Sequence, residues 1–151
     1  MRVALIQMSV TADKEKNIAA ACQYIRQAAE HGADMAVLPE MFCCPYDNGC
    51  FRAYGEEAGG PAQTALSKAA AELGLYVVGG SLPELEGGRV YNTSYVYGRQ
   101  GELLAKHRKV HLFDIAVAGG QRFMESDTLS PGDQITTFDT EFGPMGLCIC
   151  F

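Results

Sequence analysis

Val3-Ala4-Leu5-Ile6, near the start of the chain, is a continuous apolar run, and Met35-Ala36-Val37-Leu38 is a second one. Such runs are typical of strands that are covered on both faces. Between them, residues 14–31 repeat apolar side chains at helical spacing, and Gly32 stands where a helix commonly ends. The order strand, helix, strand predicts two parallel strands joined by a right-handed crossover.

A second helix is expected over residues 61–73, because Pro61 suits the first helical position and Gly74 suits the stop. Strands separated by glycine-containing turns should follow it, over residues 75–82, 90–97 and 102–105. Their spacing predicts an antiparallel meander. Together with the parallel pair, this pattern indicates an α/β fold with a mixed sheet.

Two more strands are expected near the end of the chain, over residues 134–138 and 145–150. The remaining segments, residues 40–60 and 107–133, are expected to be long loops, and loops of that length are usually functional. The chain stops at Phe151, directly after a hydrophobic strand. A domain rarely ends there, so we expect residues 1–151 to be part of a longer protein.

Bulk properties narrow the class of protein. The 151 residues suit one domain, and the net charge of −6 argues against non-specific binding to nucleic acid. No apolar run approaches the ~20 residues that cross a bilayer, and the start does not resemble a signal peptide. We therefore expect a cytoplasmic protein with no membrane partner, whose six cysteines are reduced thiols.

Four residues could carry chemistry, although each also has a structural interpretation. Glu40 follows a buried strand at the sheet edge where ligands bind, but could be a solvated loop residue. Lys109 could belong to an exposed basic turn, and Glu125 to a surface loop. Cys150 could be an inert buried thiol on the same side of its strand as Cys148.

A metal site is not expected. The histidines and cysteines do not have the C-x₂-C spacing of a zinc module; those considered are His107, His111, Cys43, Cys44, Cys148 and Cys150. A module that binds metal or exchanges thiols nevertheless stays open as an alternative.

Taken together, three ordered segments resemble the nitrilase superfamily of carbon-nitrogen hydrolases, which has a Glu–Lys–Cys triad in this order. The segments are Leu38-Pro39-Glu40-Met41-Phe42, His107-Arg108-Lys109-Val110-His111-Leu112-Phe113-Asp114 and Gly146-Leu147-Cys148-Ile149-Cys150-Phe151. Residues 125–133 and Cys44-Pro45-Tyr46 look most like the omega-amidase branch. The resemblance implies an α-β-β-α sandwich, of which residues 1–151 would be roughly the first half, ending just after the nucleophile.

The resemblance also implies roles for individual residues. Glu40, Lys109 and Cys150 would be catalytic, and Glu125 would help to position the lysine and the substrate. Lys109 and the backbone N–H of Phe151 would stabilise an oxyanion. From their places in the loops, Tyr46 and Met124 are further candidates for lining the substrate pocket.

The implied reaction hydrolyses the terminal amide of a small omega-amide, of the 2-oxo dicarboxylic acid monoamide type, with water and no cofactor. The complete protein would be a homodimer or a larger homo-oligomer. Three departures from the pattern, Phe151, Ala116 and Cys43, bear on the choice of substrate. Alternatives are an amidase for another small amide or an N-carbamoyl compound, and an inactive half-domain that associates with a partner chain.

Overall fold

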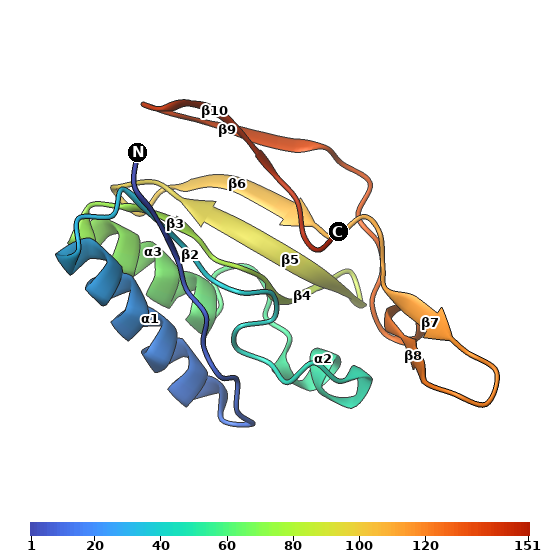
Figure 1. Ribbon diagram of the computed structural model, residues 1–151. Helices are drawn as coiled ribbons and strands as arrows, with labels where there is room; N and C mark the ends of the chain where they lie inside the picture. The colour runs from blue at the N-terminus through green and yellow to red at the C-terminus, as the bar shows by residue number, and fades with distance from the viewer.

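Six strands form the main sheet of this computed structural model, which describes residues 1–151 (Figure 1). They are β1 (Val3–Leu5), β2 (Met35–Val37), β3 (Tyr76–Val78), β4 (Leu82–Glu86), β5 (Arg89–Tyr97) and β6 (Leu103–Arg108). β2 runs parallel to both β1 and β3, whereas β3, β4 and β6 each run antiparallel to β5. The predicted parallel pair and the predicted mixed α/β sheet are therefore confirmed.

The single strand expected over residues 75–82 is in fact two strands, β3 and β4. Gly80 separates them with a left-handed φ of 53°, which a regular strand cannot contain. A side chain here would also collide with the carbonyl oxygen of Pro39, so only glycine fits. The break turns the chain and brings Ser81 against the segment that follows β2.

Two helices cover one face of the main sheet (Figure 1): α1 (Lys14–Glu30) and α3 (Pro61–Leu73). Asp13 caps α1 by accepting a hydrogen bond of 3.0 Å from the N–H of Lys16. Gly32 and Gly74 follow the two helices in left-handed conformations, with φ of 72° and 65°. The sequence predicted both helices, the first from its apolar spacing and Gly32, the second from Pro61 and Gly74. Their apolar faces enclose a core with Ala36, Val77 and Tyr95 of the sheet.

A small hairpin lies over the opposite face of the sheet (Figure 1). It consists of β9 (Thr136–Thr140) and β10 (Gly143–Leu147), paired antiparallel. Phe138 of β9 packs with Met35, Val96 and other residues of the sheet. The hairpin does not reach β1, and Leu5 is 82% exposed. The expectation that β1 is covered on both faces is therefore wrong for this chain.

Both expected loops contain regular structure. Residues 40–60 include the short helix α2 (Asn48–Tyr54), and residues 107–133 include β7 (Asp114–Ala116) and β8 (Arg122–Met124). β7 and β8 form a hairpin, followed by the 3₁₀ turn η1 (Glu125–Asp127). These elements are too short for hydrophobic periodicity to reveal them.

The last strand also differs from its prediction. β10 ends at Leu147, and Cys150 has a left-handed φ of 64°. A strand cannot continue through such a residue, so the alternation that placed Cys148 and Cys150 on one side of a strand does not apply. Both cysteines are exposed, and all six cysteines are free thiols. None of the helices has the length and apolar character needed to cross a membrane.

Candidate active site

Glu40 is held at the carboxyl end of β2 by the turn between β3 and β4. The hydroxyl of Ser81 accepts a hydrogen bond of 2.9 Å from the N–H of Met41, and its carbonyl accepts one of 3.1 Å from Phe42. Met41 has a φ of 54°, a strained conformation for a residue with a side chain. The local backbone is thus bent and fixed directly after the glutamate.

Lys109 follows β6 and points into the same region. Its backbone N–H donates to the carbonyl of Asn92 on β5, and its own carbonyl accepts from the N–H of Gly132, both at 2.8 Å. Its Nζ lies 2.9 Å from Oε1 of Glu40 and 3.0 Å from Oε1 of Glu125. Burial disfavours the ammonium, but hydrogen bonds to Glu40 and Glu125 outweigh it and raise the pKa of Lys109 above its ordinary value. Lys109 is therefore a buried cation.

Glu125 begins η1 and is fully buried. Its Oε2 accepts a hydrogen bond of 2.7 Å from the N–H of Phe113, and its N–H donates to the carbonyl of Phe113 at 3.1 Å. These two bonds connect η1 to the segment just before β7. They leave Oε1 of Glu125 directed at Lys109.

The hydroxyl of Tyr46 lies among these three residues. It contacts Oε1 of Glu40 at 3.0 Å, lies within hydrogen-bond distance of Oε1 of Glu125, and lies 3.3 Å from Nζ of Lys109. Burial and the hydrogen bond to Glu125 raise the pKa of Tyr46 far above its ordinary value, so the phenol stays neutral. We call Glu40, Tyr46, Lys109 and Glu125 the Lys109 cluster.

The other candidate residues lie outside this cluster. Cys150 and Phe151 are exposed, and no hydrogen bond or ion pair joins either residue to the Lys109 cluster. Met124 is partly buried, and its carbonyl accepts a hydrogen bond of 2.8 Å from the side chain of Asn48. The structure thus brings together Glu40, Tyr46, Lys109 and Glu125, but not Cys150.

Asn92 is a contact of the cluster that sequence reasoning missed. It is fully buried on β5, and its Nδ2 donates to Oε1 of Glu40 at 2.7 Å. The available signal was an asparagine inside a predicted strand rich in β-branched and aromatic residues, where this residue type is depleted.

An aromatic hollow of about 250 Å³ adjoins the cluster through Tyr46. Phe113, Gln121 and Phe123 line the rest of it, so one amide side chain lies among three rings. The ring of Phe123 lies 5.9 Å from that of Tyr46 and 6.5 Å from that of Phe113. The hollow could accept a small, mostly apolar group beside the polar cluster.

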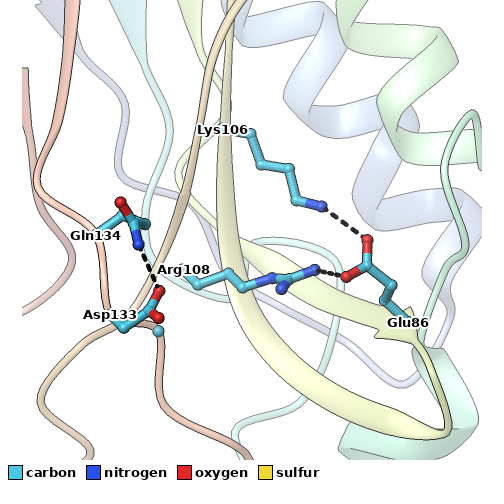
Figure 2. A pocket seen from close by; sticks show the side chains of 6 residues that line it. Glu86, Lys106, Arg108, Asp133 and Gln134 are labelled. Atoms are coloured by element: carbon cyan, nitrogen blue, oxygen red, sulfur yellow. Dashed lines mark hydrogen bonds and ion pairs between the residues drawn. The ribbon is translucent and has the colours of Figure 1, made fainter.

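A second hollow, of about 230 Å³, is lined by polar residues (Figure 2). Figure 2 shows Glu86 paired with both Lys106 and Arg108, with N···O distances of 3.5 and 2.6 Å. Glu84 pairs with the same two side chains, so two carboxylates neutralise the two cations. Asp133, across the hollow, accepts a hydrogen bond from Gln134. We assign this hollow a structural role, because Arg108 fixes the end of β6 just before Lys109.

Nothing in the structure resembles a metal centre: no three or more His, Cys, Asp and Glu side chains are grouped to hold an ion. His107, considered above as a ligand, is buried and shares a hydrogen bond of 2.9 Å with the hydroxyl of Thr136.

Comparison with known proteins places the chain in a family. Residues 2–151 match the model of the carbon-nitrogen hydrolase family. Omega-amidase NIT2 of Mus musculus and that of Homo sapiens are each 48% identical to the chain over 150 residues, which are 99% of this chain and 54% of the relative. The chain therefore spans about half the length of these relatives.

Solved structures agree. Nit3 of Saccharomyces cerevisiae, a member of branch 10 of the nitrilase superfamily, is 39% identical with a TM-score of 0.86, covering 98% of this chain and 54% of its own. A mutant amidase from Nesterenkonia sp. AN1, whose active site cysteine carries the product of Michael addition of acrylamide, is 25% identical with a TM-score of 0.82, covering 99% and 57%. The resemblance inferred from the three sequence segments is therefore confirmed, and the chain belongs to the carbon-nitrogen hydrolase family.

Proposed function

We propose that the protein containing this chain hydrolyses the terminal amide of a small omega-amide, of the 2-oxo dicarboxylic acid monoamide type, to the acid and ammonia. The observation that carries this proposal is the Lys109 cluster: a buried cation between two carboxylates, in a chain 48% identical to omega-amidase NIT2. Burial strengthens the field of such a group at a reacting carbonyl.

In the proposed reaction, Cys150 attacks the amide carbonyl carbon and Glu40 takes the thiol proton. A free thiol titrates near 8.5, so it needs such a base close to neutral pH. Lys109 and the backbone N–H of Phe151 stabilise the oxyanion, and one such donor is worth roughly 3–4 kcal/mol. The raised pKa of Lys109 supports this role, because the side chain stays charged.

Glu40 then returns the proton to the departing nitrogen, and ammonia leaves. Water activated by Glu40 cleaves the thioester and regenerates the thiol. Glu125 holds Lys109 in place. Tyr46, with the aromatic hollow beside it, and Met124 contribute to the substrate pocket. The reaction as proposed uses no cofactor or metal, and its partners are the amide and water.

We further propose that residues 1–151 are the N-terminal portion of a longer catalytic domain in a cytoplasmic homo-oligomer. Val3 and Leu5 expose apolar surface on the sheet face that the β9–β10 hairpin leaves open. Exposed apolar surface of this kind is normally covered by further structure. Purified alone, residues 1–151 are expected to release no ammonia, and thiol-dependent release by that fragment would contradict this proposal.

The direct test is a substitution made in the full-length protein. Cys150→Ser should abolish ammonia release while leaving the circular dichroism spectrum and the melting temperature unchanged. Turnover at the wild-type rate by this variant would refute the nucleophile. Rates on a panel of omega-amides, simple amides and N-carbamoyl compounds then separate the proposed substrate class from the alternatives.

A further inference from the structure

We infer that Asn92 is a positioning residue that gives the two oxygens of the Glu40 carboxylate different roles. This inference rests on the proposed function and deepens it. It assigns Oε1 of Glu40 to holding the side chain in place and leaves Oε2 to exchange the proton with Cys150.

The geometry joins Asn92 to two members of the proposed triad, the base Glu40 and the oxyanion donor Lys109. Its side-chain Nδ2 donates to Oε1 of Glu40 at 2.7 Å, and its backbone carbonyl accepts from the N–H of Lys109 at 2.8 Å. One residue of β5 therefore sets the side chain of the glutamate and the backbone of the lysine relative to each other.

Every hydrogen bond to Glu40 ends on Oε1. Three donors reach this oxygen: Nδ2 of Asn92 at 2.7 Å, Nζ of Lys109 at 2.9 Å and the hydroxyl of Tyr46 at 3.0 Å. None of the hydrogen bonds involves Oε2, although the side chain is 26% exposed. Oε2 is therefore the oxygen of Glu40 available to a proton from outside the cluster.

Tyr46 cannot replace Asn92 as the neutral donor. A phenol carries a single hydrogen, and the Tyr46 hydroxyl has Oε1 of Glu125 as well as Oε1 of Glu40 within reach. When its hydrogen points to Glu125, Asn92 and Lys109 are the two donors left on Glu40. The Lys109 ammonium donates to both Glu40 and Glu125, so Asn92 is the donor that serves Glu40 alone.

The energetics indicate a role other than stability. Asn92 is fully buried, and its Oδ1 has no hydrogen-bond partner. A buried unsatisfied polar atom costs about 1–3 kcal/mol, which a leucine of similar volume would avoid. Strand β5 thus keeps a costly side chain whose one hydrogen bond goes to Glu40.

Asn92→Leu removes the donor together with the unsatisfied oxygen, and Asn92→Asp keeps the shape but loses the donor. Both should lower kcat by roughly 10- to 100-fold, because Glu40 loses its alignment, with KM changed less than about twofold. Ser94→Ala is the matched control. Ser94 lies two residues along the same strand, is fully buried, and also has an unsatisfied oxygen, but does not contact Glu40. It should leave kcat within about twofold of wild type.

A second readout needs no substrate. The rate at which iodoacetamide alkylates Cys150, followed by peptide mass spectrometry, should fall in both Asn92 variants and stay unchanged in Ser94→Ala. The melting temperature of Asn92→Leu should match or exceed that of wild type, whereas that of Asn92→Asp should fall, because a second carboxylate is then buried 2.7 Å from Glu40. Wild-type kcat and wild-type alkylation in the Asn92 variants, or equal losses in Ser94→Ala, would overturn the inference.

Cys150→Ser, assayed in parallel, separates this inference from the proposed function. If Cys150→Ser is inactive while both Asn92 variants turn over normally, only the role of Asn92 is wrong. If Cys150→Ser turns over normally, the proposed cysteine mechanism fails, and the Asn92 inference fails with it.

Discussion

Lys109 and Glu125 form an ion pair from which water is excluded: Nζ and Oε1 are 3.0 Å apart, and neither side chain has exposed surface. Such a pair is held by mutual neutralisation, since each partner alone would be a costly buried charge. Glu40 also contacts Lys109, but its side chain is partly exposed. Glu125 is therefore the main counter-charge within the protein interior.

Glu125→Gln should lower the free energy of unfolding by about 3 kcal/mol, because Lys109 keeps only the partly exposed Glu40 as a counter-charge. Turnover should fall as well, since the lysine loses one of its two anchors. Urea unfolding at neutral pH measures the first effect. Asp127→Asn is the control from the same 3₁₀ turn: its pair with Arg122 is exposed and worth at most about 1 kcal/mol. Equal losses in the two variants would contradict the prediction.

Tyr46→Phe tests the phenol without disturbing the ring contacts to Phe51 and Phe123. Loss of a hydrogen bond to a carboxylate should lower the free energy of unfolding by about 1.5–3 kcal/mol and reduce turnover. Since the pKa of Tyr46 is raised far above its ordinary value, this phenol should not ionise near pH 10.0. Ultraviolet titrations of wild type and variant should then coincide through that range, and a missing tyrosine transition in Tyr46→Phe would refute it.

The framework of the fold could be predicted because local signals mark it. Pro61 and Gly74 bound α3, and the apolar runs of β1 and β2 predict strands at the right places, although only β2 is buried in this chain. β7 and β8 could not be predicted, because strands of three residues carry almost no periodicity. Tertiary contacts such as the bonds between Glu125 and Phe113 hold them in place.

In the candidate site too, residues within recognisable sequence segments could be predicted, whereas a residue whose role depends on tertiary contacts could not. Glu40, Lys109 and Cys150 were identified together from three ordered segments, and Glu125 from the loop at residues 125–133; none would stand out alone. Asn92 was missed because its role depends on the strand register that places β5 beside the end of β6. Register is set by the packed sheet and cannot be read from one strand.

Gly132 packs closely against the backbone at the end of β6. A Cβ at this position would come within 2.5 Å of the carbonyl oxygen of Arg108, while the N–H of Gly132 bonds the carbonyl of Lys109. Gly132→Ala should therefore cost about 1–3 kcal/mol of stability and displace Lys109, which lowers kcat. Gly146→Ala is the matched control on β10, since a Cβ there meets open space. Urea unfolding and kcat of both variants check this prediction. Unchanged stability and kcat in Gly132→Ala would exclude the close contact.

Arg108 and Glu84 give the fold a pH dependence. Glu84 is 3% exposed, and Nε and Nη2 of Arg108 each lie 2.8 Å from one of its oxygens. Burial alone would raise the pKa of Glu84, but hydrogen bonds from Arg108, Lys106 and Thr93 outweigh it and hold the pKa below the ordinary 4.5. The carboxylate therefore contributes stability that is fully present above pH 4.5 and is lost as the pH falls through the lower folded-state value.

Arg108→Met should remove about 3 kcal/mol of stability at neutral pH, because it leaves Glu84 buried with Lys106 as its one remaining cation. The difference in unfolding free energy between wild type and variant should shrink as the pH falls through the folded-state pKa of Glu84, since a protonated Glu84 no longer needs the guanidinium. Urea unfolding at a series of pH values between about 7 and 3 measures it. Arg122→Met, which removes an exposed pair with Asp127, should give a small difference at every pH. A difference for Arg108→Met that stayed constant with pH would mean that lost packing on Tyr91, whose ring centroid lies 3.8 Å from the guanidinium, outweighs the charge.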